Sequence, residues 1–381
     1  MNADRAEFVT EALRTGTLAG LPGGHFIDGR FVESASGRRM DSFDPGRGKA
    51  FATVAAGDAE DIDRAVAAAR TALSGPWSRL TAAARGEILM RASRLIAERA
   101  ARFAVVETLD SGKRLAEAEG DVGGVVKAFA YYAGAADKLH GDSMPLGSDH
   151  IGLTIEEPVG VAAQIVPWNY PLSTAARGIA PALAAGCTLV VKPAEQTPFT
   201  TLMLAELLHE AGLPAGVLNV VAGTGAEAGA ALTGHPGIDH ITFTGSVATG
   251  QRVMRAAAEH VTRLILELGG KSPLVVLADC DRDAAVAGIM EAIFENAGQI
   301  CSAGSRLIVE EAIAEPLLER LVASAQALRP GHGLSDAGIG PINSPAQLAR
   351  VAGHVDRARA AGNRILTGGA VVPPEDCGGG W

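Results

Sequence analysis

The chain has 381 residues, of which 48% are hydrophobic and 20% charged, with a formal net charge of −10. It is long enough for two or three domains and too long for a disulfide-stabilised mini-protein. The acidic balance argues against binding to nucleic acid or to an anionic membrane, because either needs clustered Lys and Arg. The four cysteines form no CxxC pair, so we expect reduced thiols in a cytoplasmic protein and no metal site. We expect neither a secretory signal nor a transmembrane helix.

The N-terminal region is predicted to be mainly helical. Residues 26–32 are typical of a hairpin with an Asp-Gly turn at Asp28. Apolar positions three and four residues apart then predict Ala-rich helices over 61–73, 82–110 and 123–136. Thr81 is expected to cap the second of these helices.

From about residue 152, short β-branched runs alternate with Ala- and Leu-rich stretches. The predicted strands are 160–166, 188–192, 217–221, 240–244 and 263–267, with helices over 173–185, 199–212, 225–233 and 247–260. A second set consists of strands 273–277 and 306–310 and helices 282–297 and 311–328. This βαβα alternation predicts a parallel sheet with helices on both faces, and hence an α/β fold.

Three residues have side chains suited to catalysis. Cys301 lies among small residues that would leave a nucleophile accessible, although a free Cys is more often a small buried hydrophobe. Glu267 ends an apolar run before two glycines, where a carboxylate is well placed for proton transfer. Asn169 stands between Pro167 and Pro171, so its amide could be a fixed donor to an oxyanion, or the segment could be an ordinary proline turn.

Several segments have features of a dinucleotide site. The run 223–228 fits a permissive G-x-G-x-x-A pattern that includes Gly225, but with 47 glycines a chance match is expected. The segment 243–246 precedes a predicted helix, whose free N–H groups would suit a phosphate. Lys192 and Glu195 follow a predicted strand; they would either hold ribose hydroxyls or form a solvated pair.

Taken together, these segments resemble the NAD(P)-dependent aldehyde dehydrogenase family. The matching motifs are Pro-Trp-Asn-Tyr-Pro at 167–171, Lys-Pro-Ala-Glu at 192–195, Phe-Thr-Gly-Ser at 243–246, Glu-Leu-Gly-Gly-Lys at 267–271 and Gly-Gln-Ile-Cys at 298–301. They occur in the family's order, with 301 − 267 = 34 residues between the Glu and the Cys. The resemblance implies a Rossmann-type NAD-binding domain (1–137 and 154–266), an oligomerisation hairpin (138–153) and an α/β catalytic domain (267–381).

The resemblance also implies the chemistry. Cys301 would attack the aldehyde, Asn169 would stabilise the oxyanion, and water activated by Glu267 would hydrolyse the thioester. A carboxylate at Glu195 would repel a 2′-phosphate, so NAD is expected in preference to NADP. The residues implied to bind the cofactor are Trp168, Lys192, Glu195, Gly225, Phe243, Thr244, Gly245, Ser246 and Leu268. Those implied to line the substrate pocket are Tyr170, Thr174, Arg177, Ile300 and Ser302.

The sequence departs from the family in two places. Many relatives have Trp-Lys where this chain has Arg177-Gly178, which alters the expected pocket. The family also continues beyond the region of 378–381, so the resemblance implies a catalytic domain that is truncated. An inactive remnant that keeps the cofactor fold, and a dehydrogenase that transfers the acyl group to coenzyme A, therefore stay open. A homodimer or homotetramer is expected of a full-length chain.

Overall fold

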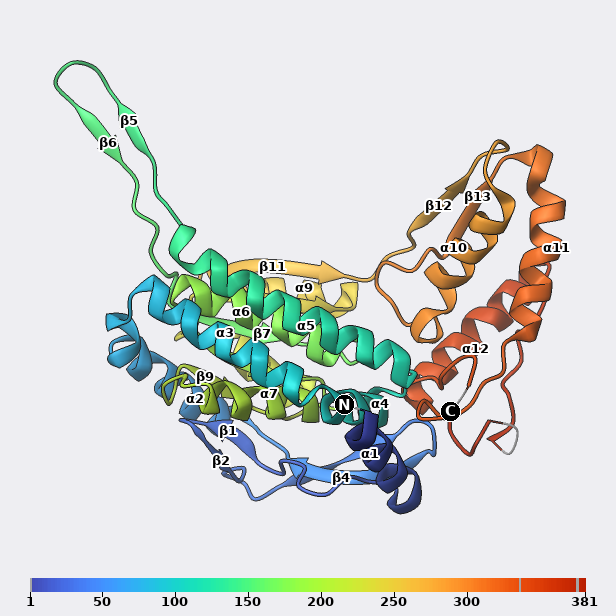
Figure 1. Ribbon diagram of the computed structural model, residues 1–381, viewed down its shortest axis with the longest axis horizontal. Helices are drawn as coiled ribbons and strands as arrows, with labels where there is room; N and C mark the ends of the chain where they lie inside the picture. The colour runs from blue at the N-terminus through green and yellow to red at the C-terminus, as the bar shows by residue number, and fades with distance from the viewer. Residues whose placement is uncertain (1, 336, 375–376) are drawn as a thin grey trace.

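The fold is described from a computed structural model that covers residues 2–335, 337–374 and 377–381. Its centre is a seven-stranded sheet with the strand order β11-β10-β7-β8-β9-β1-β2 (Figure 1). The strands are β1 (His25–Ile27), β2 (Arg30–Val32), β7 (Val161–Ile165), β8 (Thr188–Lys192), β9 (Leu218–Val220), β10 (His240–Gly245) and β11 (Arg263–Leu268). Strands β7 to β11 are parallel, as predicted, and the β1–β2 hairpin adds to β9 in the antiparallel sense.

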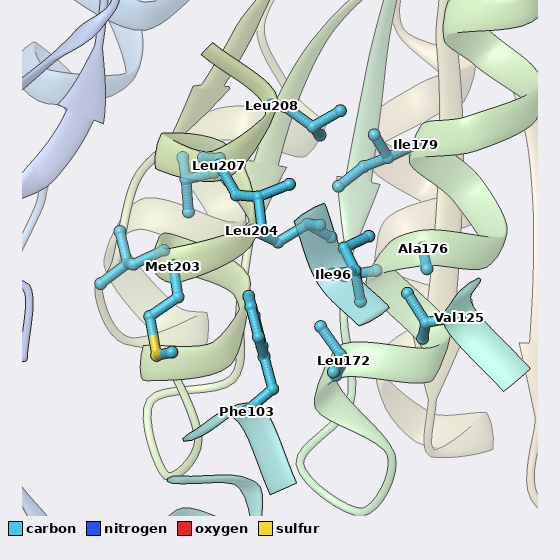
Figure 2. Packing of buried hydrophobic residues seen from close by; sticks show 14 of the residues in the cluster. Ile96, Phe103, Val125, Leu172, Ala176, Ile179, Met203, Leu204, Leu207 and Leu208 are labelled. Carbon is cyan, nitrogen blue, oxygen red and sulfur yellow. The ribbon is translucent and has the colours of Figure 1, made fainter. Parts of the chain in front are cut away.

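Helices cover both faces of this sheet, because alternate residues of each buried strand point to opposite sides. Ala162 of β7 packs in the larger core, whereas Val161 and Ala163 pack in the other. The larger core lies among α3 (Ala82–Glu98), α4 (Ala100–Ser111), α5 (Leu115–Ala135), α6 (Pro171–Ala185) and α7 (Phe199–Glu210) (Figure 2). The other core lies under α2 (Ala59–Leu73), α8 (Ala230–Thr233) and α9 (Val247–Ala258).

Two predicted helices are interrupted. The helix predicted over 82–110 is two helices, α3 and α4, which meet at Arg99. Thr81 caps α3 as predicted, by accepting a hydrogen bond from the Ala84 N–H. The helix predicted over 225–233 begins as one π-helical turn, η3 (Gly225–Gly229), before α8. Short 3₁₀ turns, η1 (Pro76–Arg79) and η2 (Ala136–Lys138), follow α2 and α5.

Two elements of the first half, a helix and a hairpin, were not predicted from the sequence, whereas the hairpin at 138–153 was expected from the family resemblance. Helix α1 (Asn2–Thr15) precedes the sheet, and strands β3 (Arg39–Asp44) and β4 (Lys49–Ala55) pair as an antiparallel hairpin. Strands β5 (Ser143–Pro145) and β6 (Ile151–Leu153) form a second hairpin, which projects away from the molecule (Figure 1). Among the described residues, no helix is both long and apolar enough to cross a membrane.

The last third of the chain forms a smaller unit beside the main sheet (Figure 1). Strands β12 (Pro273–Val276) and β13 (Arg306–Val309) are parallel and are joined through α10 (Arg282–Phe294) and the 3₁₀ turn η4 (Glu295–Gly298). Helices α11 (Glu311–Ala327) and α12 (Pro345–Ala360) follow. The predicted helix 282–297 therefore stops three residues early, because Asn296 and Ala297 adopt left-handed backbone angles.

Candidate active site

The parallel part of the sheet begins with β7, adds β8 and β9 on one side, and then adds β10 and β11 on the other. The carboxyl ends of β7 and β10 therefore border the point where the strand order reverses, which is where open α/β sheets bind ligands. A cavity of about 1220 Å³ opens at this point. Its lining includes Trp168, Lys192, Glu195, Gly225, Phe243, Thr244, Gly245, Ser246, Glu267 and Cys301. Leu268, also expected there, does not line the cavity; its side chain reaches toward Gly250 of α9.

A second cavity, of about 400 Å³, adjoins the first. It is lined by the residues expected in the substrate pocket: Tyr170, Thr174, Arg177, Ile300 and Ser302. The two cavities share five residues: Pro167, Asn169, Thr244, Ile300 and Cys301. Cys301 is thus reachable from both sides, and its side chain is exposed.

The backbone before Cys301 is held in an uncommon conformation. Asn296, Ala297 and Gly298 have φ values of 47°, 54° and 74°, in the left-handed region. Such angles cost an Ala of the order of 1–2 kcal/mol, so the surroundings must hold the turn in place. Asn296 does so, since its N–H donates to Glu117 Oε1 (3.1 Å) and its Nδ2 donates to the Asn169 carbonyl (3.0 Å).

Asn169 and Gln299 connect the two loops that meet at Cys301. The Asn169 Nδ2 donates to the Gln299 carbonyl at 2.7 Å. The Gln299 side chain is buried; its Nε2 donates to the carbonyls of Asn296 (3.0 Å) and Pro341 (3.3 Å), and its Oε1 accepts from the Asn343 N–H (2.9 Å). The nucleophile loop is therefore fixed both to the loop after β7 and to the segment before α12. Gln299 was not identified as a site residue from the sequence.

The cofactor side of the site is built on three strand ends. Burial lowers the pKa of Lys192, whose Nζ donates to the carbonyls of Pro193 (2.6 Å) and Gly223 (2.8 Å) and lies 3.6 Å from Glu195 Oε2. Lys192 thereby joins the loops after β8 and β9, while Glu195 stays partly exposed to the cavity. Ser246 caps α9 by accepting from the Thr249 N–H, which leaves other first-turn N–H groups for an anion.

A buried ionic network lies behind the smaller cavity. The ammonium of Lys113 is fully buried, pairs with Asp121, lies 3.4 Å from Glu107 and sits 4.1 Å from the centre of the Tyr170 ring. Burial raises the pKa of Glu107, although Lys113 and a hydrogen bond from Thr200 oppose the shift. Burial also raises the pKa of Tyr170, whose hydroxyl donates to Glu295 at 3.4 Å. None of these charged groups was identified from the sequence.

The structure explains one of the departures noted above. A Cβ at Gly178 would lie 2.3 Å from the Gln164 Nε2, so a side chain at this position would require the Gln164 side chain to move. Gln164 in turn donates to the Thr174 carbonyl, which fixes the start of α6 beneath the pocket. Within the described part of the chain, no group of three His, Cys, Asp or Glu side chains is arranged to hold a metal ion.

Comparison with known proteins agrees with this geometry. The model of the family described as "Aldehyde dehydrogenase family" matches residues 31–381. The chain belongs to the aldehyde dehydrogenase family. Its members are oxidoreductases, and the family assignment, the α/β fold and the Rossmann-like sheet predicted from the sequence are confirmed.

Individual relatives cover most of the chain. The betaine aldehyde dehydrogenase of Bacillus subtilis is 42% identical over 355 residues, which are 92% of this chain and 72% of that protein. A structure of the Staphylococcus aureus betaine aldehyde dehydrogenase in complex with NAD+ superposes with a TM-score of 0.94 at 39% identity, over 97% of this chain and 74% of that one. The NAD+ complex of a Bacillus cereus aldehyde dehydrogenase has a TM-score of 0.91 at 40% identity, over 93% and 73%.

Proposed function

We propose that this aldehyde dehydrogenase oxidises an aldehyde to a carboxylic acid, with NAD as the hydride acceptor. The observation that carries the proposal is the position of Cys301 at the junction of two cavities. A nucleophile there can receive an aldehyde from the smaller cavity while a dinucleotide occupies the larger one. The relatives solved in complex with NAD+ support the same arrangement.

The residues of the larger cavity fit a dinucleotide. Its volume of about 1220 Å³ exceeds the usual range for small-ligand sites, which is roughly 300–1,000 Å³. Glu195 would accept hydrogen bonds from ribose hydroxyls and repel a 2′-phosphate, which favours NAD over NADP. The first turn of α9 after Ser246 would hold the pyrophosphate. Gly225, where a Cβ would meet no atom within 4 Å, leaves open space on the cavity wall.

The chain's own residues would act in two stages. The Cys301 thiolate adds to the aldehyde carbon, and the second Asn169 N–H, together with the Cys301 backbone N–H, stabilises the oxyanion. NAD, when bound, supplies the acceptor for the hydride that leaves this carbon. Glu267 then takes a proton from water, the resulting hydroxide adds to the Cys301 thioester, and the thiolate leaves as the acid forms. Glu267 lines the larger cavity, so the base lies on the side from which the hydride has been removed.

Two further assignments belong to this proposal. The β5–β6 hairpin (138–153) would contact a second copy, because Leu146, Ile151 and Leu153 of the projecting hairpin are all exposed. The four free cysteines suit a reducing compartment, the cytoplasm. Residues 1–137 and 154–266 would form the NAD-binding domain, and residues 267–381 the catalytic domain.

The test is NADH formation by the 381-residue chain with a panel of aldehydes, beside Cys301→Ala and the matched control Cys280→Ala. We expect Cys301→Ala to abolish turnover and Cys280→Ala to retain it, with NAD giving a higher kcat/KM than NADP. Products are analysed with and without coenzyme A, where free acid is expected. Binding of NAD without turnover would favour the inactive remnant, and accumulation of acyl-coenzyme A would favour the acylating reaction.

A further inference from the structure

The lining of the smaller cavity includes side chains of both charges. Arg177 and Glu295 both line it, together with the carboxylate of Asp121. The remaining lining is mixed: it includes the polar Ser173, Thr174 and Ser302 as well as apolar side chains such as Ala292 and Ile300. A pocket of this composition is poorly suited to a hydrocarbon aldehyde, since such a substrate would remove charged groups from water without replacing their hydrogen bonds.

The charge of Asp121 is already compensated. Its carboxylate pairs with the buried ammonium of Lys113, which also lies near Glu107. Both partners of the pair are largely shielded from solvent, so Asp121 serves mainly to hold Lys113 in place. The charges that remain for a ligand are therefore those of Glu295 and Arg177.

Glu295 has no counter-ion among the described residues. It is half-buried at the C-terminal end of α10, and the hydrogen bond to its carboxylate comes from the Tyr170 hydroxyl at 3.4 Å. Burial and the nearby carboxylates of Glu117 and Asp121 raise the pKa of Glu295. An ammonium group in the cavity would relieve this repulsion and supply the missing hydrogen bonds.

Arg177 is the complementary case. Ser173, Thr174 and Arg177 lie on one face of α6, at the spacing of one helical turn, and all three line the cavity. No carboxylate pairs with the Arg177 guanidinium in the part of the chain that the structure describes. A guanidinium binds a carboxylate through two parallel hydrogen bonds, so an unpaired one on a cavity wall suits a carboxylate ligand.

We infer that the aldehyde substrate carries both an ammonium and a carboxylate group, with the ammonium facing Glu295 and the carboxylate facing Arg177. This inference rests on the proposed function of the same site. An aldehyde with the positive charge alone would meet Arg177 unpaired, and one with the negative charge alone would meet Glu295. Only a short zwitterionic aldehyde, such as one derived from an α-amino acid, satisfies both groups in a cavity of about 400 Å³.

A series of four-carbon aldehydes tests the inference. The series comprises butanal, 4-aminobutanal, 4-oxobutanoate and 2-amino-4-oxobutanoate, which differ mainly in charge. We expect 2-amino-4-oxobutanoate to have a kcat/KM at least about tenfold above each of the others, since a hydrogen bond to a charged group contributes of the order of 1.5–3 kcal/mol. Equal or faster oxidation of butanal would overturn the inference.

Two charge-neutralising variants assign the preference to residues. Relative to butanal, Glu295→Gln should lower kcat/KM about tenfold for the two ammonium substrates, and Arg177→Gln for the two carboxylate substrates. The matched controls are Glu291→Gln, an exposed acid one turn earlier on α10, and Arg255→Gln on α9; both should leave the substrate ratios unchanged. If kcat/KM relative to butanal is unchanged in both Glu295→Gln and Arg177→Gln, the assignment of the charge preference to these residues is wrong.

Thiol labelling separates this inference from the proposed function. Methanethiosulfonates with an ammonium, a sulfonate or no charge are compared for their rate of reaction with Cys301, measured by mass spectrometry of the Cys301 peptide. Glu295→Gln should slow the ammonium reagent, and Arg177→Gln the sulfonate reagent, each relative to the neutral one. If no aldehyde is oxidised but these ratios change, the proposed function fails and the charge pattern stands. If oxidation depends on Cys301 and the ratios do not change, the inference fails alone.

Discussion

Gln299 connects the nucleophile loop to the rest of the molecule, and its removal should have a measurable cost. In Gln299→Met the side-chain volume is nearly kept, but the Asn343 N–H and the Pro341 carbonyl lose their partner. The Asn296 carbonyl keeps one donor, the Gln299 backbone N–H at 3.0 Å. Two buried groups are therefore left unpaired, each costing roughly 1–3 kcal/mol. Because the adjoining cavity admits water to Gln299, we expect a total of about 2–4 kcal/mol.

Hydrogen exchange at the Asn343 amide measures this loss locally. A change of about 2–4 kcal/mol in the opening free energy corresponds to exchange faster by roughly 30- to 700-fold. Urea unfolding should show a similar decrease, and Gln299→Ala should lose more, since it also leaves a cavity. The reasoning would be refuted if Gln299→Met left Asn343 exchange unchanged and cost less than about 0.5 kcal/mol in unfolding free energy.

Two further predictions concern single side chains. Asn169→Ala should lower kcat by about 10²–10³-fold. It should cost only about 1 kcal/mol of unfolding free energy, because Asn296 Nδ2 also lies 3.4 Å from the Gln299 carbonyl. A loss of unfolding free energy as large as the rise in activation free energy would argue against an oxyanion role. His25 is buried beside Asp61, and desolvation lowers its pKa below the ordinary value of about 6.5. The unfolded chain then binds the proton first, so stability present above about pH 6.5 should decline as the pH falls toward the folded-state pKa. The unfolding free energy, measured with urea, should fall less between pH 7 and pH 5.5 in His25→Gln than in the unchanged protein. An equal fall in both proteins would assign the pH dependence to other groups.

The parallel strands β7 and β8 were predictable because they are fully buried. β7 and β8 consist mainly of apolar and β-branched residues between glycine- and proline-containing loops, and burial on both faces favours this composition. The catalytic motifs follow these strands directly, so their convergence at one sheet edge follows from the topology. Asn169 after β7 and Glu195 after β8 illustrate this.

Other features depend on tertiary contacts and leave no local signal. The break at Arg99 contains neither Pro nor Gly; at this point Arg99 pairs with Glu210 of α7, and Phe103 packs in the core. Nothing in the sequence spacing of Glu107 and Asp121 reveals that both carboxylates lie beside the buried Lys113 ammonium. Glu295 lies inside the helix predicted over 282–297, where nothing in the sequence marks it as a pocket residue. Glu107 and Asp110 are an exception, since both are acids in a stretch of α4 that is largely apolar from Phe103 to Leu109.

The arrangement of the cavities gives the proposals a common logic. Residues that line only the smaller cavity, such as Arg177 and Glu295, meet the aldehyde alone, whereas Glu195 and Gly225 meet only what fills the larger one. Substitutions in the first group should alter the KM for aldehyde, and those in the second the KM for NAD. Asn169 and Cys301 border both cavities, so changes there act on the reaction itself. This division separates a residue that selects the substrate from one that performs the chemistry, whatever the identity of the aldehyde.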